Sequence, residues 1–462
     1  MKLTELFSSL ANAVRKIKSS NKKMTPENCI KRLETIEPYD GSNDLEAPVE
    51  KETSYLEELL DGTLEKVYDE KTMFIGEATF AFCSSLQEAV FPNCSYIGDY
   101  AFSGCKLLTS INFPLCEYIG TGAFNYSIPL QEVNFPACTY IGNTAFINCT
   151  SLTSVSFPMC ESIGNGAFSS CTSLTSISSP NCTSIGEFAF CNCSSLTEVS
   201  FPMCSKIERR TFEYCKSLKK VNFLNCTYIE HGAFPSCSSL QEAIFPNCSY
   251  IGTGAFSSCT SLSNISFPNC SYIAEYAFYS CRKLQEASFP NCSGIGMSAF
   301  RYCTSLTSIN FPICSYIGGS AFGSCSSLQN INFPQCSKIG SWAFTNCTSL
   351  QSVNFPMCTS IGSEVFYTCT SLQEVSFPMC SFIGNFAFEA CRSLESVYLN
   401  VSSVPQLNDV TAFNGTPLDF STYLGYYGSI YVPVSLYDAF CSATNWATYS
   451  SRIVGYDFEG GK

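Results

Sequence analysis

Residues 152–173 read LTSVSFPMCESIGNGAFSSCTS, and this unit of 22 residues repeats along most of the chain. Its first residue is leucine, which recurs every 22 residues from Leu64 to Leu394. Its seventeenth residue is phenylalanine in every copy from Phe80 to Phe388. The consensus is L-x-x-[VI]-x-F-P-x-C-x-x-I-G-x-x-A-F-x-x-C-x-S. A fixed period of this length predicts a solenoid, in which each coil buries its apolar residues only against the neighbouring coils.

The apolar positions of the unit predict how each coil folds. We expect a strand at positions 3–6, for example residues 154–157, with positions 1, 4 and 6 pointing inward and the proline at position 7 ending the pairing. Isoleucine at position 12 and Ala-Phe at positions 16–17 predict a second short strand and one helical turn. Glycine at position 13 suggests a tight turn, although Glu208, Glu230 and Ala274 show that a positive φ is not obligatory there. The predicted fold is an α/β solenoid, a right-handed superhelix of short parallel strands and turns with capped ends.

The repeats are flanked by segments of different composition. At the N-terminus apolar residues follow helical spacing, and Thr25-Pro26-Glu27 is typical of a helix start. After Leu394 the pattern decays into a predicted last strand at residues 430–433 and a helix from Ser435. Five segments are therefore predicted: a small helical module at 1–37, an acidic linker at 38–52, an N-terminal cap helix at 53–63, the solenoid of about 15 repeats at 64–399, and a C-terminal cap at 400–462.

The composition excludes several classes of partner. The formal net charge of −13 argues against nucleic acid, because phosphate binding requires a basic stripe. No apolar run approaches the roughly 18 residues of a membrane span. The basic N-terminus lacks the continuous apolar stretch and cleavage site of a signal peptide.

The 31 cysteines fall almost entirely at positions 9 and 20 of the unit. Equivalent residues in successive coils stack at roughly 4.8 Å, whereas a disulfide needs Cβ atoms about 3.8 Å apart with a turned dihedral angle. We therefore expect two ladders of buried, reduced thiols that act as small apolar fillers. This expectation favours synthesis in a reducing compartment.

The sequence shows no pattern of a catalytic or metal site. The single histidine, His231, has no triad pattern around it, and the cysteines form no C-x-x-C pair. The acidic residues near Asp40 and Asp44 lack the glycine and glutamate of a calcium loop. We predict no enzymatic activity, no cofactor and no metal.

Two groups of surface residues are candidate binding sites. Tyrosine recurs at position 11, and a row of stacked tyrosines either holds a glycan or protein edge or only stabilises the solenoid. Basic residues gather near position 210, where they either bind an acidic partner or the acidic linker of another subunit, or simply form a charged face. The candidates are Tyr96, Tyr118, Tyr140, Tyr228, Tyr250, Tyr272 and Tyr316 in the first group, and Lys206, Arg209, Arg210, Lys216, Lys219 and Lys220 in the second.

The repeat resembles a known family. Ile163-Gly164, Ala167-Phe168, Cys171 and Leu174 match the I-G-x-x-A-F-x-x-C-x-S-L pattern of BspA-like leucine-rich repeats, also called the Treponema pallidum type, and the match covers residues 64–399. The closing segment from Tyr431 to Ile453 resembles the C-terminal cap common in such proteins from gut bacteria. Residues 3–28 resemble a short module of phage and prophage tail-associated proteins. The family implies adhesion to proteins or host surfaces, without a fixed ligand and without catalytic residues.

These observations favour a non-enzymatic binding protein. The repeats would recognise a protein or glycan on a cell surface, as an extracellular or virion-associated component, and the N-terminal module is a candidate site of homo-oligomerisation. The alternative is a structural spacer or self-assembling component with no ligand on the repeats.

Overall fold

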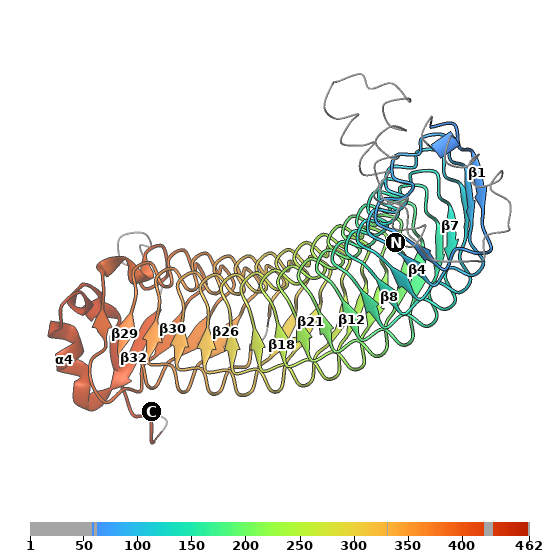
Figure 1. Ribbon diagram of the computed structural model, residues 1–462. Helices are drawn as coiled ribbons and strands as arrows, with labels where there is room; N and C mark the ends of the chain where they lie inside the picture. Colours follow the sequence, from blue (N-terminus) through green and yellow to red (C-terminus); the bar gives the residue numbers. More distant parts are fainter. Residues whose placement is uncertain (1–57, 60–61, 330, 420–427, 461–462) are drawn as a thin grey trace, which may run out of the picture. The chain divides into compact units, whose positions relative to one another are not determined.

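The structure is a computed structural model that describes residues 58–59, 62–329, 331–419 and 428–460. The chain divides into two compact units, with the boundary between Asn181 and Cys182. The predicted N-terminal module and acidic linker lie outside the described residues, as does most of the predicted N-terminal cap helix. Both units are stacks of 22-residue coils with parallel strands, so the predicted solenoid is confirmed (Figure 1). We number the coils from 1, which begins at Leu64, and refer to positions 1 to 22 within each coil.

Each coil of the first unit contributes two short strands, one at positions 3–5 and one at positions 11–12. We call the row of strands at positions 3–5 the first sheet, although its hydrogen-bonded ladder is interrupted after β5 and after β9. Its strands are β1 (Lys66–Tyr68), β3 (Glu88–Val90), β5 (Ser110–Asn112), β7 (Glu132–Asn134), β9 (Ser154–Ser156) and β11 (Ser176–Ser178). The strands at positions 11–12 form the second sheet: β2 (Phe74–Ile75), β4 (Tyr96–Ile97), β6 (Tyr118–Ile119), β8 (Tyr140–Ile141) and β10 (Ser162–Ile163).

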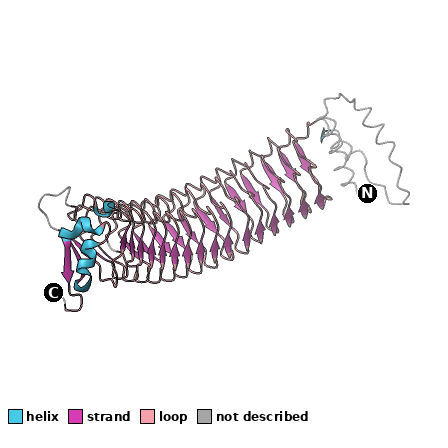
Figure 2. Cartoon of the chain, turned by 90° about the vertical axis from the view of Figure 1, so that its left-hand side faces the viewer, coloured by secondary structure: helices cyan, strands magenta, loops and turns pink. Residues whose placement is uncertain are grey.

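The second unit repeats this arrangement, and Figure 2 shows the strands as two rows along the stack of coils. After β13 (Glu198–Ser200), the row of its first sheet consists of three separate hydrogen-bonded ladders. They are β15 (Lys220–Asn222), β17 (Glu242–Ile244) and β19 (Asn264–Ser266); β21 (Glu286–Ser288) and β23 (Ser308–Asn310); and β26 (Ser352–Asn354), β28 (Glu374–Ser376) and β30 (Ser396–Tyr398). Its second sheet contains ten strands: β14 (Lys206–Ile207), β16 (Tyr228–Ile229), β18 (Tyr250–Ile251), β20 (Tyr272–Ile273), β22 (Gly294–Ile295), β24 (Tyr316–Ile317), β25 (Lys338–Ile339), β27 (Ser360–Ile361), β29 (Phe382–Ile383) and β31 (Gln406–Leu407). The strand β12 (Ser184–Ile185) is not part of this hydrogen-bonded sheet.

Neighbouring strands pair in parallel with a register of one full repeat. Val67 lies opposite Ala89 in the first sheet, and Ile229 lies opposite Ile251 in the second. Residues at the same unit position therefore stack on one another along each unit, which places any row of like side chains on one face.

The core consists of two ladders of phenylalanine rings. At position 17, Phe256 stacks on Phe234 and on Phe278 with ring centroids 5.2 and 5.4 Å apart. At position 6, Phe245 stacks on Phe267 at 5.2 Å, and the two ladders meet edge to face. The leucine, isoleucine, alanine and cysteine positions fill the remaining interior and are buried in nearly every coil. The position-6 ladder is interrupted at Ser179, which occupies this position in its coil and donates its hydroxyl to the carbonyl oxygens of Phe157 and Cys160.

The helical turn expected around positions 16–17 is absent from the described coils, which have a chain of β-turns there. In coil 2 the N–H of Ala101 bonds to the carbonyl of Gly98, and the N–H of Cys105 bonds to that of Phe102. The residues at positions 15 and 19, here Tyr100 and Gly104, have φ values of 56° and 69°. A positive φ at the third residue is the mark of a type II turn, so two such turns replace the helix. We call positions 13–20 the turn side of the coil.

The tight turn expected at position 13 is present, since the carbonyl of Gly98 accepts from the N–H of Ala101, but the glycine itself does not have a positive φ. Its role is close contact between coils, because a Cβ on Gly142 would lie 2.5 Å from the carbonyl carbon of Gly120 in the preceding coil. The left-handed residues come two and six positions later, and most of them are not glycine.

The C-terminal segment closes the second unit. The predicted last strand is present as β32 (Ser429–Pro433), which pairs in parallel with β30 and with β33 (Ile453–Tyr456). The short helices are η1 (Val410–Phe413), η2 (Val434–Leu436), α4 (Tyr437–Ser442) and η3 (Trp446–Arg452) (Figure 2). Phe413 extends the position-17 ladder by stacking on Phe388 at 5.3 Å, and the buried Trp446 packs beside it. This arrangement covers the apolar end that an unpaired last coil would expose.

Candidate binding surfaces

The tyrosines of the first unit form one continuous stack on the second sheet. Phe74, Tyr96, Tyr118 and Tyr140 follow one another with ring centroids 4.5, 4.6 and 4.8 Å apart and planes within 10° of parallel. Phe74 is exposed and the three tyrosines are half-buried. Burial raises the pKa of Tyr118, so its hydroxyl stays protonated at neutral pH. The sequence prediction of a tyrosine row on one face is correct in this unit.

The second unit contains a shorter tyrosine row with a gap. Tyr228 and Tyr250 stack at 4.6 Å, whereas Tyr250 and Tyr272 are 6.1 Å apart. The next coil has Gly294 at this position, and a Cβ there would lie 3.3 Å from the ring of Tyr272. Tyr272 therefore leans over the glycine. Tyr316, which is exposed, follows one coil later.

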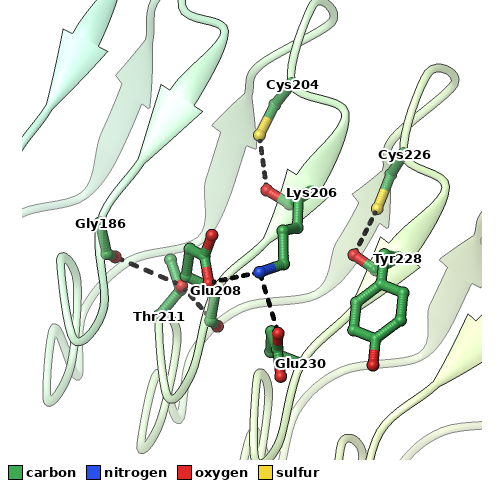
Figure 3. Close-up of polar contacts among 8 residues, drawn as sticks. All are labelled: Gly186, Cys204, Lys206, Glu208, Thr211, Cys226, Tyr228 and Glu230. Carbon is green, nitrogen blue, oxygen red and sulfur yellow. Dashed lines mark hydrogen bonds and ion pairs between the residues drawn. The ribbon is translucent and has the colours of Figure 1, made fainter.

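Lys206 is held by two carboxylates (Figure 3). Its Nζ lies 3.0 Å from Glu208 Oε2 and 2.9 Å from Glu230 Oε1. Both glutamates occupy position 13, where most coils have glycine, and the same Nζ lies 5.7 Å from the ring centroid of Tyr228. The hydrogen bond to Glu230 is the main cause that raises the pKa of Lys206. This cation is therefore largely neutralised by residues of its own unit.

The other basic candidates do not join Lys206 in a single patch. Arg209 and Arg210 lie in the turn after β14 and each places its guanidinium 5.8 Å from the ring of Phe188. Arg210 also approaches Glu213 at 3.7 Å. Lys219 and Lys220 lie in the following coil at the first sheet, where Lys220 pairs with Glu242 at 2.6 Å, and Lys216 precedes them in the turn. The six residues are thus spread around two successive coils.

The turn side carries aromatic residues that we did not select from the sequence. At positions 15 and 19 these residues have a left-handed backbone, which is an outlier for a bulky side chain. Phe82, Tyr126 and Trp342 are exposed by 69%, 53% and 47%. The signal was present in the sequence, because these two positions otherwise hold mostly glycine, serine, asparagine and threonine. The full set is Phe82, Tyr100, Tyr126, Phe188, Tyr214, Tyr276, Tyr302, Trp342 and Phe386.

With this geometry described, we compared the chain with known proteins. Four overlapping segments, 73–182, 161–285, 227–335 and 293–418, match the family model described as "BspA type Leucine rich repeat region (6 copies)". These segments span most of the sequence. The chain belongs to the BspA-type leucine-rich-repeat family. A comparison with curated protein sequences gives no significant match.

The chain is also similar to several solved leucine-rich repeat structures. A leucine-rich repeat protein from Bacteroides ovatus is 28% identical, with a TM-score of 0.57, over 75% of this chain and 91% of that one. A leucine-rich repeat protein of T. pallidum is 29% identical over 38% of this chain and 72% of that one, with a TM-score of 0.27. A leucine-rich cell surface protein from Faecalibacterium prausnitzii is 23% identical over 67% and 87%, with a TM-score of 0.38. No family match covers residues 3–28 or supports their resemblance to a tail-associated module.

The cysteines of the BspA-type coils are donors as well as fillers. At position 20 the thiol of Cys259 donates to the carbonyl oxygen of Phe234 in the preceding coil, at 3.1 Å. At position 9 the thiol of Cys248 donates to the carbonyl oxygen of Tyr250, at 3.2 Å. Burial raises the pKa of Cys149 to about 12 and that of Cys94 to about 11. The thiolate, which is the nucleophilic and metal-binding form, is therefore disfavoured.

The described residues contain no constellation that indicates catalysis or metal binding. All described cysteines are free thiols, and only Cys191 and Cys441 among them are partly exposed. Within the same residues no group of three or more His, Cys, Asp or Glu side chains is placed to hold a metal ion. Likewise, no helix in the described part of the chain is long and apolar enough to cross a membrane.

Proposed function

We propose that this protein is a non-enzymatic binding protein whose repeats recognise a protein or glycan ligand on a cell surface. The observation that carries the proposal is the tyrosine stack of Tyr96, Tyr118 and Tyr140 on the second sheet. The rings are fixed by their neighbours, so little side-chain entropy is lost on binding. Tyrosine combines apolar area with a hydroxyl and is enriched at interfaces.

The shape of the stack indicates what kind of contact it makes. Because the faces of the inner rings are covered by one another, each coil presents a ring edge and a hydroxyl at a spacing near 4.7 Å. A flat, regular strip of this kind fits an extended ligand that lies along the unit. The second row, from Tyr228 to Tyr272 with Tyr316 beyond the gap, offers a shorter strip of the same chemistry.

The basic candidates form a secondary part of the proposal. Lys206 and Lys220 are paired with glutamates, so an acidic partner would have to compete for them. Arg209, Lys216 and Lys219 carry no ion pair among the described residues and are the better candidates for contacts with an acidic partner.

The finer parts of the functional proposal concern the ends of the chain and its location. We propose that residues 1–37 attach the repeats to a larger particle of the phage or prophage tail type that their sequence resembles, and that they mediate self-association. The protein would then act at an extracellular or virion surface after synthesis with reduced thiols. These points rest on the sequence resemblance of residues 3–28 and on membership in a family whose resemblance implies adhesion.

The test uses full-length protein in a binding screen against bacterial cells and arrays of glycans and proteins. Tyr118→Ser and Tyr250→Ser remove the centres of the two rows, and coils with Ser162 or Ser360 already carry serine at this position. We expect each to reduce binding at least fivefold without lowering the unfolding temperature appreciably. The matched control is Tyr398→Ser, which removes a ring stacked on Tyr431 in the first sheet. If wild-type protein binds none of these targets, the alternative of a structural spacer is favoured.

A further inference from the structure

The densest aromatic group on the turn side lies in coils 10 and 11 of the second unit. Tyr276 and Tyr279 meet at 5.8 Å, and Tyr279 and Tyr302 meet at 5.4 Å with planes nearly perpendicular. The guanidinium carbon of Arg301 lies 4.9 Å from the centre of the Tyr302 ring. We call these four residues the aromatic–arginine cluster.

Arg301 lacks an anionic partner. Its Nε is buried and makes no hydrogen bond, and the side chain takes part in none of the ion pairs of the described residues. Lys206, Arg210 and Lys220 are each paired with glutamate. Other described cations, such as Arg209 and Lys219, also lack an ion pair, so what sets Arg301 apart from them is its buried Nε without a hydrogen bond. Guanidinium groups bind carboxylates with paired, charge-assisted hydrogen bonds.

The fold gives positions 15 and 19 a left-handed backbone in every described coil, but packing does not require an aromatic side chain there. Tyr276 has a φ of 57° and Tyr302 a φ of 65°. The same two positions hold Ser298 and Ser280 in these two coils, so the fold accepts small residues there. Bulky residues held in the left-handed region point to a functional role for the side chains.

The coil that follows the cluster has only small residues at four positions of its turn side. Coil 12 has Gly319, Ser320, Gly323 and Ser324 at positions 14, 15, 18 and 19. The two residues between them, Ala321 and Phe322, are buried. Coil 13 then presents Trp342, which is 47% exposed and has a φ of 61°. Aromatic rings therefore border a stretch of small residues on both sides.

The backbone of the turn side leaves no edge for a peptide strand. The N–H groups of Tyr276, Ser280 and Tyr302 already donate to carbonyls of the next coil. Recognition by strand addition is therefore excluded at these residues, and only side chains are available. Aromatic rings that pack against the C–H faces of a sugar, together with a guanidinium for a carboxylate, match an acidic carbohydrate better than a peptide backbone.

We propose that the aromatic–arginine cluster binds a carboxylated sugar residue of a surface glycan. This inference rests on the proposed binding function and deepens it by naming a ligand class and a second face. Arg301 pairs with the sugar carboxylate, Tyr302 and Tyr276 pack against the ring, and Trp342 contacts the next residue of the chain. The carboxylate belongs to a sialic acid or to a uronic acid, and the two are separated by the choice of probe.

The experiment is isothermal titration of the full-length protein with three probes: 3′-sialyllactose, a hyaluronan tetrasaccharide and neutral lactose. We expect one of the two carboxylated probes to bind at least tenfold more tightly than lactose. Arg301→Gln should weaken that binding at least tenfold. Arg282→Gln, which removes an exposed arginine of coil 10 at position 21, should leave it unchanged. Tyr302→Ser introduces the residue of the equivalent position in coil 12 and should weaken binding while thermal unfolding stays at or above the wild-type temperature.

The inference is overturned if neither acidic probe binds better than lactose, or if Arg301→Gln binds like the wild type. These results are distinct from a failure of the proposed function. Wild-type protein that still binds cells or arrays, and loses that binding in Tyr118→Ser, would retain the proposed function while the cluster loses its assigned ligand.

Discussion

Ser127 donates its hydroxyl to the carbonyl oxygen of Phe102 at 3.1 Å, in the one coil where serine replaces cysteine at position 20. In the next coil the thiol of Cys149 makes the same bond to Phe124 at 3.2 Å. The substitution shows what this position needs, which is a small side chain that donates to a buried carbonyl. Cysteine fulfils this need with a weak donor and a larger apolar volume.

The first prediction separates these two contributions at Cys259. Cys259→Ser keeps the donor to Phe234, and we expect the free energy of unfolding to change by less than about 1 kcal/mol. Cys259→Ala removes the thiol donor and leaves the Phe234 carbonyl with only the longer bond from the N–H of Cys237 at 3.4 Å, which should cost about 0.5–1.5 kcal/mol. Urea unfolding followed by circular dichroism measures both. An alanine variant as stable as the serine variant would show that volume alone matters.

The second prediction concerns alkaline pH. Burial raises the pKa values of Cys149, Cys248 and Cys303 from 9.0 to about 12 each. Above pH 9 the unfolded chain loses these protons while the folded chain keeps them, so the folded state binds more protons and stability falls as the pH rises. The stabilisation is complete below pH 9 and is lost between about pH 9 and 12. Each thiol contributes up to about 1.4 kcal/mol per pH unit.

Urea midpoints measured at pH 7, 8, 9, 10 and 10.5 check this pH dependence. We expect a flat response up to about pH 8.5 and a steep decline above it. Cys149→Ser combined with Cys303→Ser should make the decline shallower, since a serine hydroxyl does not titrate in this range. A decline with the same slope in the double variant would assign it to other groups, namely the remaining buried cysteines or the tyrosines.

The sequence predicts the interior of this protein far better than its turns. A strict period and inward positions such as Leu152 and Phe168 define the stacking, because each coil repeats the same burial. The left-handed backbone at position 15 could not be predicted, because residues as different as Tyr276 and Ser298 occupy that position and no single residue type marks it. The sequence predicts the turn at position 13 but not the close contact that glycine makes there, because that contact is with the neighbouring coil, 22 residues away.

The candidate surfaces show the same division between what the repeat predicts and what it does not. The tyrosine row follows directly from register, since residues at equal positions must stack. Register does not predict a basic cluster, because Arg210 and Lys220 are only ten residues apart in sequence but lie on different sides of the coil. Pairing of Lys206 with Glu208 and Glu230 depends on side-chain geometry that composition does not reveal.

The third prediction tests the close contact at position 13. Gly142→Ala places a Cβ 2.5 Å from the carbonyl carbon of Gly120 and 2.6 Å from the N of Thr121. These are backbone atoms that cannot rotate away, so the coils must separate locally. We expect the free energy of unfolding to fall by about 1–3 kcal/mol, as for other overpacked sites. Gly166→Ala is a control, because its nearest contact would be 3.5 Å and only its φ of 60° opposes the change.

The fourth prediction applies the opposite change two residues later. Thr144 is β-branched and has a φ of 51°, while Gly122 and Gly166 hold the same position in the adjacent coils. Thr144→Gly removes a left-handed strain of roughly 1–2 kcal/mol but increases the entropy of the unfolded chain. We expect a net gain of about 0.5 kcal/mol, measured by urea unfolding. A loss of stability would mean that the Thr144 side chain contributes packing that outweighs its strain.

The last prediction addresses the ion pairs of Lys206. Lys206→Gln leaves Glu208 and Glu230 facing each other without their shared cation, so the cost combines a lost attraction with a new repulsion. Lys338 is the matched control, since it occupies position 11 but has Gly340 and Gly362 at position 13 in its own and the following coil. We expect Lys206→Gln to lower the free energy of unfolding by about 0.5–1 kcal/mol more than Lys338→Gln, because partly exposed pairs contribute on this scale.

The difference between the two variants should shrink when the salt concentration rises from 10 to 500 mM (roughly 30 to 4 Å Debye length), because screening weakens both attraction and repulsion. A difference that persists at high salt would instead assign the effect to packing of the lysine stem against Tyr228.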